Sequence, residues 1–408
     1  MAEKTASRSK RLMTTGGIIF LVLGIALYFL KAPMGLTRKI YDLPVFLIII
    51  GICSAIKGFT AKDKTEEEAA LAGKTFTEFL TNNAILLAML VLVVVICILQ
   101  PRFMQIRVAL DILTQSSPKL IMALGICFAL LIAGTDLSAG RMVGLAAVIS
   151  ASMMQTATYA NRFFPDLPQL PLWIPIAAAI VACMLFGALN GFIVAKYEMH
   201  PFIATLATQV IIYGVCSLYF DMPPNNSQPI GGIRPDFAQI GQLRLFNGLW
   251  KGFPGISILI PIALVICVII WFILNKTVFG KNVYAIGGNR EAAVVAGINV
   301  FRNIMFIFIL ASLLYGIAGV LEAARTAGAT NNYGLGYETD AIAACVVGGV
   351  SMSGGIGKVG GIVMGVLIFT VIQYGLQFIN VSPMWQQVIK GVIIAVAVAI
   401  DMTKYRKK

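Results

Sequence analysis

The stretch NKTVFGKNVYAIGGNREAAVVAG, residues 275–297, is a polar island between two apolar runs of the chain. The run before it covers 256–274 and the run after it covers 304–321, and each is long enough to cross a bilayer. A polar segment between two such runs must lie in water. The positive-inside rule predicts the cytoplasmic side, because four basic residues lie in the island or close behind it: Lys276, Lys281, Arg290 and Arg302.

The second half of this island predicts a short helix whose two ends are both specified. Asn289 is a good N-cap, and Glu291 brings negative charge to the first turn. Gly297 suits the residue after the last turn. Between them, Ala292, Ala293 and Ala296 give a small, smooth face. A capped helix of about two turns at the ends of two spans is suited to docking into a groove of another protein.

Composition places the whole chain in the membrane. Of its 408 residues, 59% are hydrophobic and 12% are charged, and the mean hydropathy is +0.88. A soluble domain carries about 25% charged residues. The net charge of +13 does not indicate nucleic acid as a partner, because the basic residues lie at the ends of apolar runs, where they set membrane orientation.

The apolar runs predict an all-α polytopic membrane protein. Two runs, 16–30 and 43–56, form an N-terminal hairpin that a charged linker extends to residue 74. Both termini are basic and hence predicted to be cytoplasmic, which requires an even number of spans. Several runs are shorter than the roughly 20 residues of a full crossing, so some are expected to be broken or re-entrant. About ten core spans follow the linker: 85–99, 120–133, 142–156, 172–194, 203–220, 256–274, 304–321, 341–350, 360–378 and 388–401.

A first polar interruption, GTDLSAGR at 134–141, separates two apolar runs with no room for an ordinary loop. A carboxylate at the centre of a span costs about 2.5–3.5 kcal/mol on insertion scales. Asp136 is therefore expected near an interface, in a cavity or paired, with Arg141 as a candidate partner if the backbone breaks at the glycines. Two interpretations remain open: a helix break that borders a transport path, or a tight turn at the membrane surface.

A second interruption at 348–357 repeats part of the first. The pattern Gly-x-x-x-Ser-x-Gly occurs at 134–140 and again at 349–355. Paired glycine interruptions in two halves of a chain point to an internal repeat that borders a solute path. The candidate path residues are Asp136, Ser138, Arg141, Asn190, Ser351 and Ser353.

Polar residues also gather between the runs 304–321 and 341–350. Glu322 and Arg325 are spaced to pair on one helical face. Four further side chains near the predicted outer face could contact a polyhydroxylated solute or an external protein, or could simply belong to a solvated loop: Asn331, Asn332, Glu338 and Asp340. The longest external loop, 221–253, is rich in Pro and Gly and is either a docking surface or a plain connector.

Several motifs for cofactors and metals are weak in this chain. Gly355-x-Gly357-x-x-Gly360 has the letters of a dinucleotide fingerprint but lacks its strand-turn-helix setting. No phosphate loop is present, so ATP binding of that kind by this chain is not expected. The seven cysteines lie in or near apolar runs without Cys-x-x-Cys spacing, and His200 is the only histidine. Hence we expect neither a metal site nor a cofactor nor a catalytic site.

The capped helix resembles the EAA loop of bacterial ABC-importer permeases. In that family the loop forms a coupling helix that sits in the ATPase subunit. The family's longer consensus ends in a proline, and the segment 307–310 lacks it. Members of the sugar-transporting branch often lack this proline too. The resemblance implies a coupling role for Asn289, Arg290, Glu291, Ala292, Ala293 and Gly297.

The segments 134–154, 201–208, 284–293 and 331–351 resemble the ribose/galactoside/arabinose group of ABC sugar permeases, and the similarity runs from about Thr75 to Lys408. The resemblance implies a permease domain at 75–408 in a bacterial cytoplasmic membrane, without catalysis of its own. The implied partners are a second permease copy, an ATPase chain with two nucleotide-binding domains, and an extracytoplasmic sugar-binding protein. Galactose, a methyl galactoside or glucose is the implied cargo.

Two other functions are alternatives to this one. A nucleoside or other polar-solute permease of the same superfamily shares the hydrogen-bonding chemistry of a sugar permease. A secondary transporter would need a relay of intramembrane carboxylates and histidines. Only Asp136 is a candidate for such a relay, and a secondary transporter has no use for the capped helix.

Overall fold

The computed structural model describes residues 84–248 and 253–406. Nearly all regular structure within these ranges is α-helix, as expected for an all-α polytopic membrane protein. The described residues fall into two compact units: 84–111 with 371–386 form the first, and the remaining described residues from 112 onward form the second. The predicted N-terminal hairpin and linker, 1–74, lie outside the described residues.

The first unit contains α5 (Ala84–Leu99), the 3₁₀ turn η1 (Pro101–Met104), the start of α6 (Ile106–Leu131) and the last part of α16 (Val359–Phe378). Aromatic packing holds these pieces together. The ring of Phe103, which is buried, lies 5.4 Å from that of Phe378 and 6.4 Å from that of Tyr374, measured between centroids. Such edge-on and tilted ring pairs add to the free energy gained by burying the rings.

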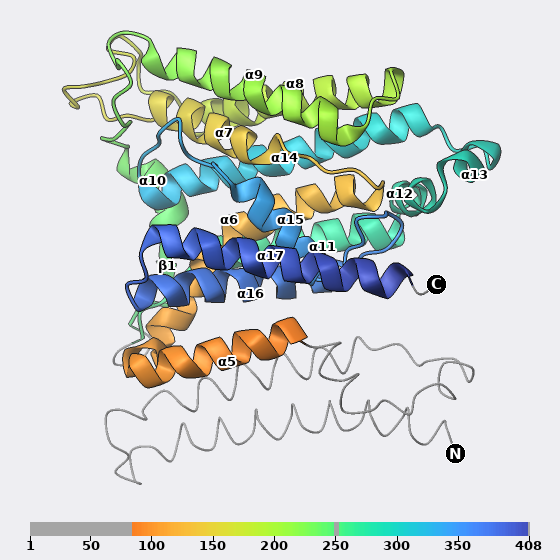
Figure 1. Ribbon diagram of the computed structural model, residues 1–408. Coiled ribbons are helices and arrows are strands. Elements are labelled where there is room, and N and C mark those ends of the chain that lie inside the picture. The colour runs from red at the N-terminus through yellow and green to blue at the C-terminus, as the bar shows by residue number, and fades with distance from the viewer. Residues whose placement is uncertain (1–83, 249–252, 407–408) are drawn as a thin grey trace. The chain divides into compact units, whose positions relative to one another are not determined.

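The second unit is built around a long helix, α14 (Val300–Thr326), which packs against α8 (Trp173–Lys196) and α7 (Ala139–Met153). Figure 1 shows these helices side by side with α9 (Pro201–Asp221), which contacts α7 and α8. Small residues permit the close approach. A Cβ added to Gly187 of α8 would stand 2.0 Å from the hydroxyl of Ser312 of α14. Glycine at helix contacts of this kind is typical of membrane proteins.

Six helices of the described residues are long and apolar enough to cross a membrane: Ile106–Leu131, Trp173–Lys196, Pro201–Asp221, Leu259–Lys276, Val300–Thr326 and Val359–Phe378. α7 is a shorter apolar helix. Large hydrophobic side chains remain exposed along α9 and along α11, which is Leu259–Lys276. An exposed apolar face is expected where a helix meets lipid. The prediction of a polytopic helical membrane protein is confirmed.

Some predicted boundaries were wrong. The run that begins at Ile256 is not helical from its start, because Ile256–Ser257 form a strand, β2, that pairs antiparallel with β1 (Arg244–Leu245). The span itself starts at Leu259. The long loop before it also contains a helix, α10 (Pro235–Gln242).

The remaining helices include short pieces. α12 (Val278–Gly288) and α13 (Arg290–Val295) follow α11, and α17 (Pro383–Arg406) closes the described chain. α15 (Tyr337–Val347) has 11 residues. At 1.5 Å per residue it spans about 16 Å, roughly half of a bilayer core. A partial crossing was expected in this part of the chain.

Candidate functional site

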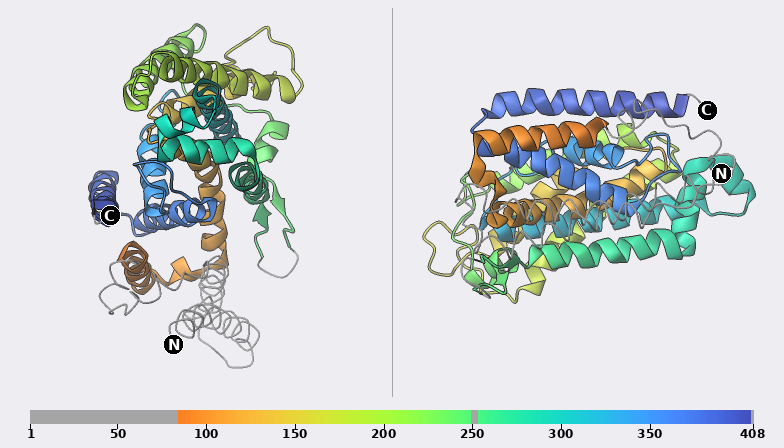
Figure 2. Two further views of the ribbon diagram at one scale, coloured as in Figure 1. Left: turned by 90° about the vertical axis from the view of Figure 1, so that its right-hand side faces the viewer. Right: turned by 90° about the horizontal axis from the view of Figure 1, so that it is seen from below.

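α13 is the predicted capped helix. The side chain of Asn289 accepts a hydrogen bond from the backbone N–H of Ala292 at 2.9 Å, and Gly297 has a φ of +81°. Both end signals of the sequence are therefore confirmed. Figures 1 and 2 show α12 and α13 projecting at the end of the second unit where α11 ends and α14 begins. Glu291 is exposed, and Val295 is 89% exposed.

The exposed face of α13 differs from the predicted face of small alanines. Ala293 is buried and faces its own unit, whereas Ala292, Val294 and Val295 face outward. The exposed surface of α13 therefore includes two valines beside the alanines. Arg290 forms an ion pair of 3.0 Å with Glu198, in the connection between α8 and α9. The helix is thus joined to a second segment of its unit.

The first interruption forms a buried polar network. Asp136 is 1% exposed, and its Oδ1 accepts hydrogen bonds from the backbone N–H and the hydroxyl of Ser138, at 3.0 and 2.5 Å. Its Oδ2 accepts from the hydroxyl of Tyr315 at 3.1 Å. Asn190 donates to the Ser138 hydroxyl at 3.0 Å and accepts from Thr208 at 2.6 Å. We call these five residues the Asp136 network.

The network corrects two expectations. A surface turn is wrong, because the carboxylate is buried and bonded to a tyrosine near the middle of α14. Arg141 as the partner of Asp136 is also wrong. Helix α7 begins at Ala139, so Asp136 lies before the helix while Arg141 lies in its first turn. The guanidinium of Arg141 stands over the ring of Tyr213, 4.2 Å from its centroid, and donates to the carbonyl of Asn331 at 3.4 Å.

Sequence reasoning missed Thr205, Thr208 and Tyr315. Thr205 holds the interrupted backbone: its hydroxyl accepts from the N–H of Leu137 at 3.1 Å and lies 3.1 Å from the carbonyl of Thr135. The two threonines are three residues apart within an apolar run, so they share a helical face. That spacing could have indicated a polar face on α9.

The second interruption lies apart from the Asp136 network. Ser351 is buried, and its hydroxyl accepts from the N–H of Ser353 at 3.2 Å. The N–H of Gly355 donates to the carbonyl of Leu131 at 2.9 Å. The second interruption therefore contacts the end of α6, just before the first interruption begins, but Ser351 and Ser353 are not brought to Asp136.

Helix α12 is tied to this meeting point. The hydroxyl of Tyr284 donates to the carbonyl of Gly357 at 2.9 Å. A Cβ added to Gly287 would stand 1.7 Å from the carbonyl oxygen of Leu131 and 2.7 Å from the nitrogen of Gly355. No residue other than glycine fits there without displacing backbone. The helix that precedes α13 thus lies against the backbone of the last residue of α6 and of the second interruption.

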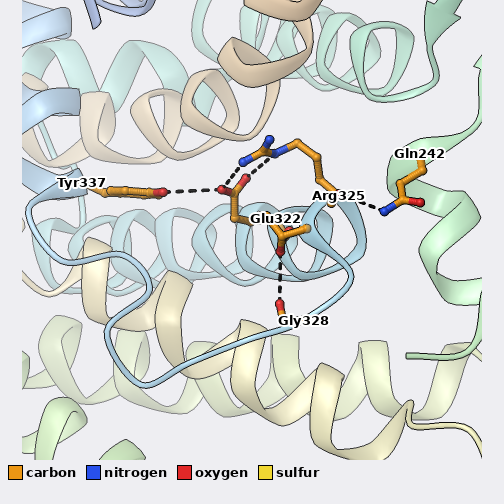
Figure 3. Close-up of polar contacts among 6 residues, drawn as sticks. Gln242, Glu322, Arg325, Gly328 and Tyr337 are labelled. Carbon is orange, nitrogen blue, oxygen red and sulfur yellow. Dashed lines mark hydrogen bonds and ion pairs between the residues drawn. The ribbon is translucent and has the colours of Figure 1, made fainter. Parts of the chain in front are cut away.

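Glu322 and Arg325 form the predicted pair. Two hydrogen bonds of 2.7 and 3.0 Å join the guanidinium to the carboxylate, and the hydroxyl of Tyr337 lies 3.5 Å from the same carboxylate (Figure 3). Gln242 of α10 donates to the carbonyl of Arg325 at 3.2 Å. The cluster connects the end of α14 to α10 and to the first turn of α15.

The four side chains expected near the outer face differ in burial and in bonding. Asn332 is exposed, whereas Asn331 is half-buried, and its amide lies 3.4 Å from the hydroxyl of Ser217. Asp340 forms an ion pair of 2.8 Å with Lys390, and Glu338 is 5% exposed. A solvated loop is therefore wrong for Glu338 and Asp340.

Within residues 84–248 and 253–406, no three His, Cys, Asp or Glu side chains come together as metal ligands, and the six cysteines found there are free. The arrangement offers hydrogen-bonding groups inside a helical bundle and one projecting helix. These are the features of a membrane permease.

Residues 108–398 match the family model described as a branched-chain amino acid transport system permease component, and the chain belongs to this permease family. The galactose/methyl galactoside import permease protein MglC of Haemophilus influenzae is 47% identical over 340 residues, covering 83% of this chain and 99% of that protein. The protein of the same name from Escherichia coli is 45% identical with the same coverage. The ribose import permease protein RbsC of Bacillus subtilis is 36% identical over 78% of this chain and 92% of that protein. No solved structure matches the chain.

Proposed function

We propose that this chain is the permease subunit of an ATP-driven importer for galactose, a methyl galactoside or a closely similar monosaccharide. The observation that carries the proposal is the similarity to galactose/methyl galactoside import permeases, at 45–47% identity over 99% of their length. The ribose permeases among the relatives are 33–36% identical, which favours the galactoside over the pentose. The protein itself has no catalytic role, and ATP is hydrolysed on a separate chain with two nucleotide-binding domains.

α13 is the proposed docking point for that ATPase. Three observations support this role: the helix is capped at both ends, its outward face is exposed, and Arg290 ties it to the α8–α9 connection. Backbone contacts at Gly287 give a route by which movement of α12 and α13 reaches the second interruption and the end of α6, which leads into the first. In this arrangement the α13 end of the second unit and both termini face the cytoplasm.

The Asp136 network is proposed to hold the interrupted segment that borders the solute path. It supports the path and does not contact the sugar, because each of its polar side chains is already bonded within the bundle. Two copies of the permease domain, 75–408, would form the path, and an extracytoplasmic binding protein would deliver the sugar. The hairpin and linker 1–74 are proposed as a peripheral addition.

The experiment is sugar uptake by the permease reconstituted in liposomes with its ATPase and the binding protein. ATP-dependent accumulation of labelled galactose, with ribose and nucleosides excluded, is the expected result. Accumulation of ribose or of a nucleoside in place of galactose would contradict the proposal. Accumulation that needs an ion gradient and no ATP would place the protein among secondary transporters.

A further inference from the structure

One face of α9 carries three polar side chains at intervals of four residues: Gln209, Tyr213 and Ser217. Residues with this spacing lie above one another on a helix. Gln209 is near the middle of the helix, so the face lies at membrane depth, where polar groups commonly mark a solute pathway. Tyr213 is 41% exposed, and Gln209 and Ser217 are half-buried, so the ring of Tyr213 is the accessible part of this face.

Each of these side chains meets a polar group from another segment. The amide of Gln209 lies 3.4 Å from Oε1 of Glu338, and the hydroxyl of Ser217 lies 3.4 Å from the amide of Asn331. The ring of Tyr213 carries the guanidinium of Arg141, 4.2 Å from its centroid. We call the six residues the α9 cluster. They come from α7, α9, α15 and the segment before α15.

The α9 cluster is loosely bonded. Its three hydrogen bonds are 3.4 Å long, whereas N–H···O bonds in proteins are commonly about 2.9–3.0 Å. Oε2 of Glu338 is buried without any hydrogen-bond partner. No ion pair joins Glu338 to Arg141 in the part of the chain that the structure describes. A buried carboxylate oxygen without a donor is costly, so it calls for a ligand that brings one.

The geometry points to the α9 cluster as the place where the transported sugar contacts the permease, and this inference rests on the proposed function. A sugar hydroxyl both donates and accepts. It can donate to Glu338 and accept from Arg141 or Gln209, while an aromatic ring such as that of Tyr213 offers an apolar face to the C–H groups of the sugar. One carboxylate and one guanidinium together favour a neutral, polyhydroxylated solute over an ion.

The test is the number of sugar molecules accumulated per ATP hydrolysed by the full complex in liposomes, with the sugar-loaded binding protein at saturation. Glu338→Gln should lower this ratio about tenfold, the usual size of losing a hydrogen bond to a charged group. Tyr213→Ala should also lower the ratio, because the apolar ring face is lost. ATP hydrolysis stimulated by the binding protein should stay at the wild-type rate. Tyr213→Phe keeps the ring and should keep the ratio. Gln209→Ala removes an amide of the α9 cluster and should lower the ratio, whereas its matched control Gln377→Ala, at an exposed position of α16, should not.

The outcomes separate the two proposals. Wild-type protein that does not accumulate galactose overturns the proposed function. Wild-type protein that accumulates galactose, with an unchanged ratio in Glu338→Gln and Tyr213→Ala, overturns the sugar contact alone. An equal fall in uptake and in ATP hydrolysis, leaving the ratio unchanged, means a structural role and also overturns it. If the Glu338→Gln complex does not assemble, the ratio of Tyr213→Ala decides whether the sugar contact exists. The side chain of Tyr213 is partly exposed, so its removal disturbs the packing less.

Discussion

Two polar regions inside the second unit are bonded in opposite ways. The Asp136 network joins the first interruption to α8, α9 and α14 through bonds of 2.5–3.1 Å, and both carboxylate oxygens of Asp136 have partners. The α9 cluster has contacts of 3.4 Å and a buried oxygen of Glu338 without a partner. The same helix, α9, contributes to both. A fully bonded polar network makes its segment rigid, whereas the unpartnered oxygen of Glu338 is where we propose that the sugar donates a hydrogen bond.

The largest expected effect comes from breaking the saturated network. Asp136→Ala leaves the hydroxyl of Tyr315 and the polar groups of Ser138 buried without their acceptor. We expect a loss of roughly 3 kcal/mol in the free energy of unfolding. Thermal unfolding of the purified protein in detergent measures it, with Asp166→Ala at an exposed position as the control. Equal midpoints for Asp136→Ala and wild type would show that the network does not support the fold.

The second effect concerns the ATPase end of the molecule. Gly297→Val puts a β-branched residue at a φ of +81°, and Glu291→Lys reverses the charge in the first turn of α13. Both variants should reach the membrane but lose most transport, since the defect is in docking. Uptake is measured per molecule of permease in the membrane. Gly360→Val, at a glycine with open space and no positive φ, is the control. Normal uptake by both α13 variants would contradict the docking role.

A third effect tests the junction of α12 with the end of α6 and the second interruption. Gly287→Ala introduces a Cβ where the carbonyl oxygen of Leu131 would be 1.7 Å away, so the backbone must shift. We expect ATP hydrolysis to continue while sugar uptake falls, because the movement of α13 no longer reaches the path. Parallel assays of hydrolysis and uptake check this. Retention of full uptake would show that coupling follows another route.

The smallest effect is expected for the ion pair between Arg290 and Glu198. Both side chains are exposed, and exposed pairs contribute about 0.2–1 kcal/mol. Glu198→Gln should therefore change the unfolding midpoint little. A large destabilisation, seen in the same thermal assay as for Asp136→Ala, would mean that this pair and not the caps holds α13 in place.

The features that the sequence predicts best are local. The caps of α13 depend on Asn289 and Gly297, which lie within a few residues of the helix, and the pair Glu322–Arg325 follows from helical spacing alone. The partner of Asp136 could not be found in this way, because Tyr315 is 179 residues away in the chain. Arg141 is nearer in sequence, but the start of α7 turns it toward α9. The buried state of Glu338 likewise depends on packing that no local pattern records.

The central claim is that the two polar regions have different roles, and one measurement tests it most directly: the sugar-to-ATP ratio of Asp136→Asn beside that of Glu338→Gln. Asparagine keeps an acceptor for Ser138, so the assembled Asp136→Asn complex should have the wild-type ratio. Glu338→Gln should have a ratio about tenfold lower. A wild-type ratio in Glu338→Gln together with a lowered ratio in Asp136→Asn would contradict the account, because the sugar contact would then lie at the Asp136 network.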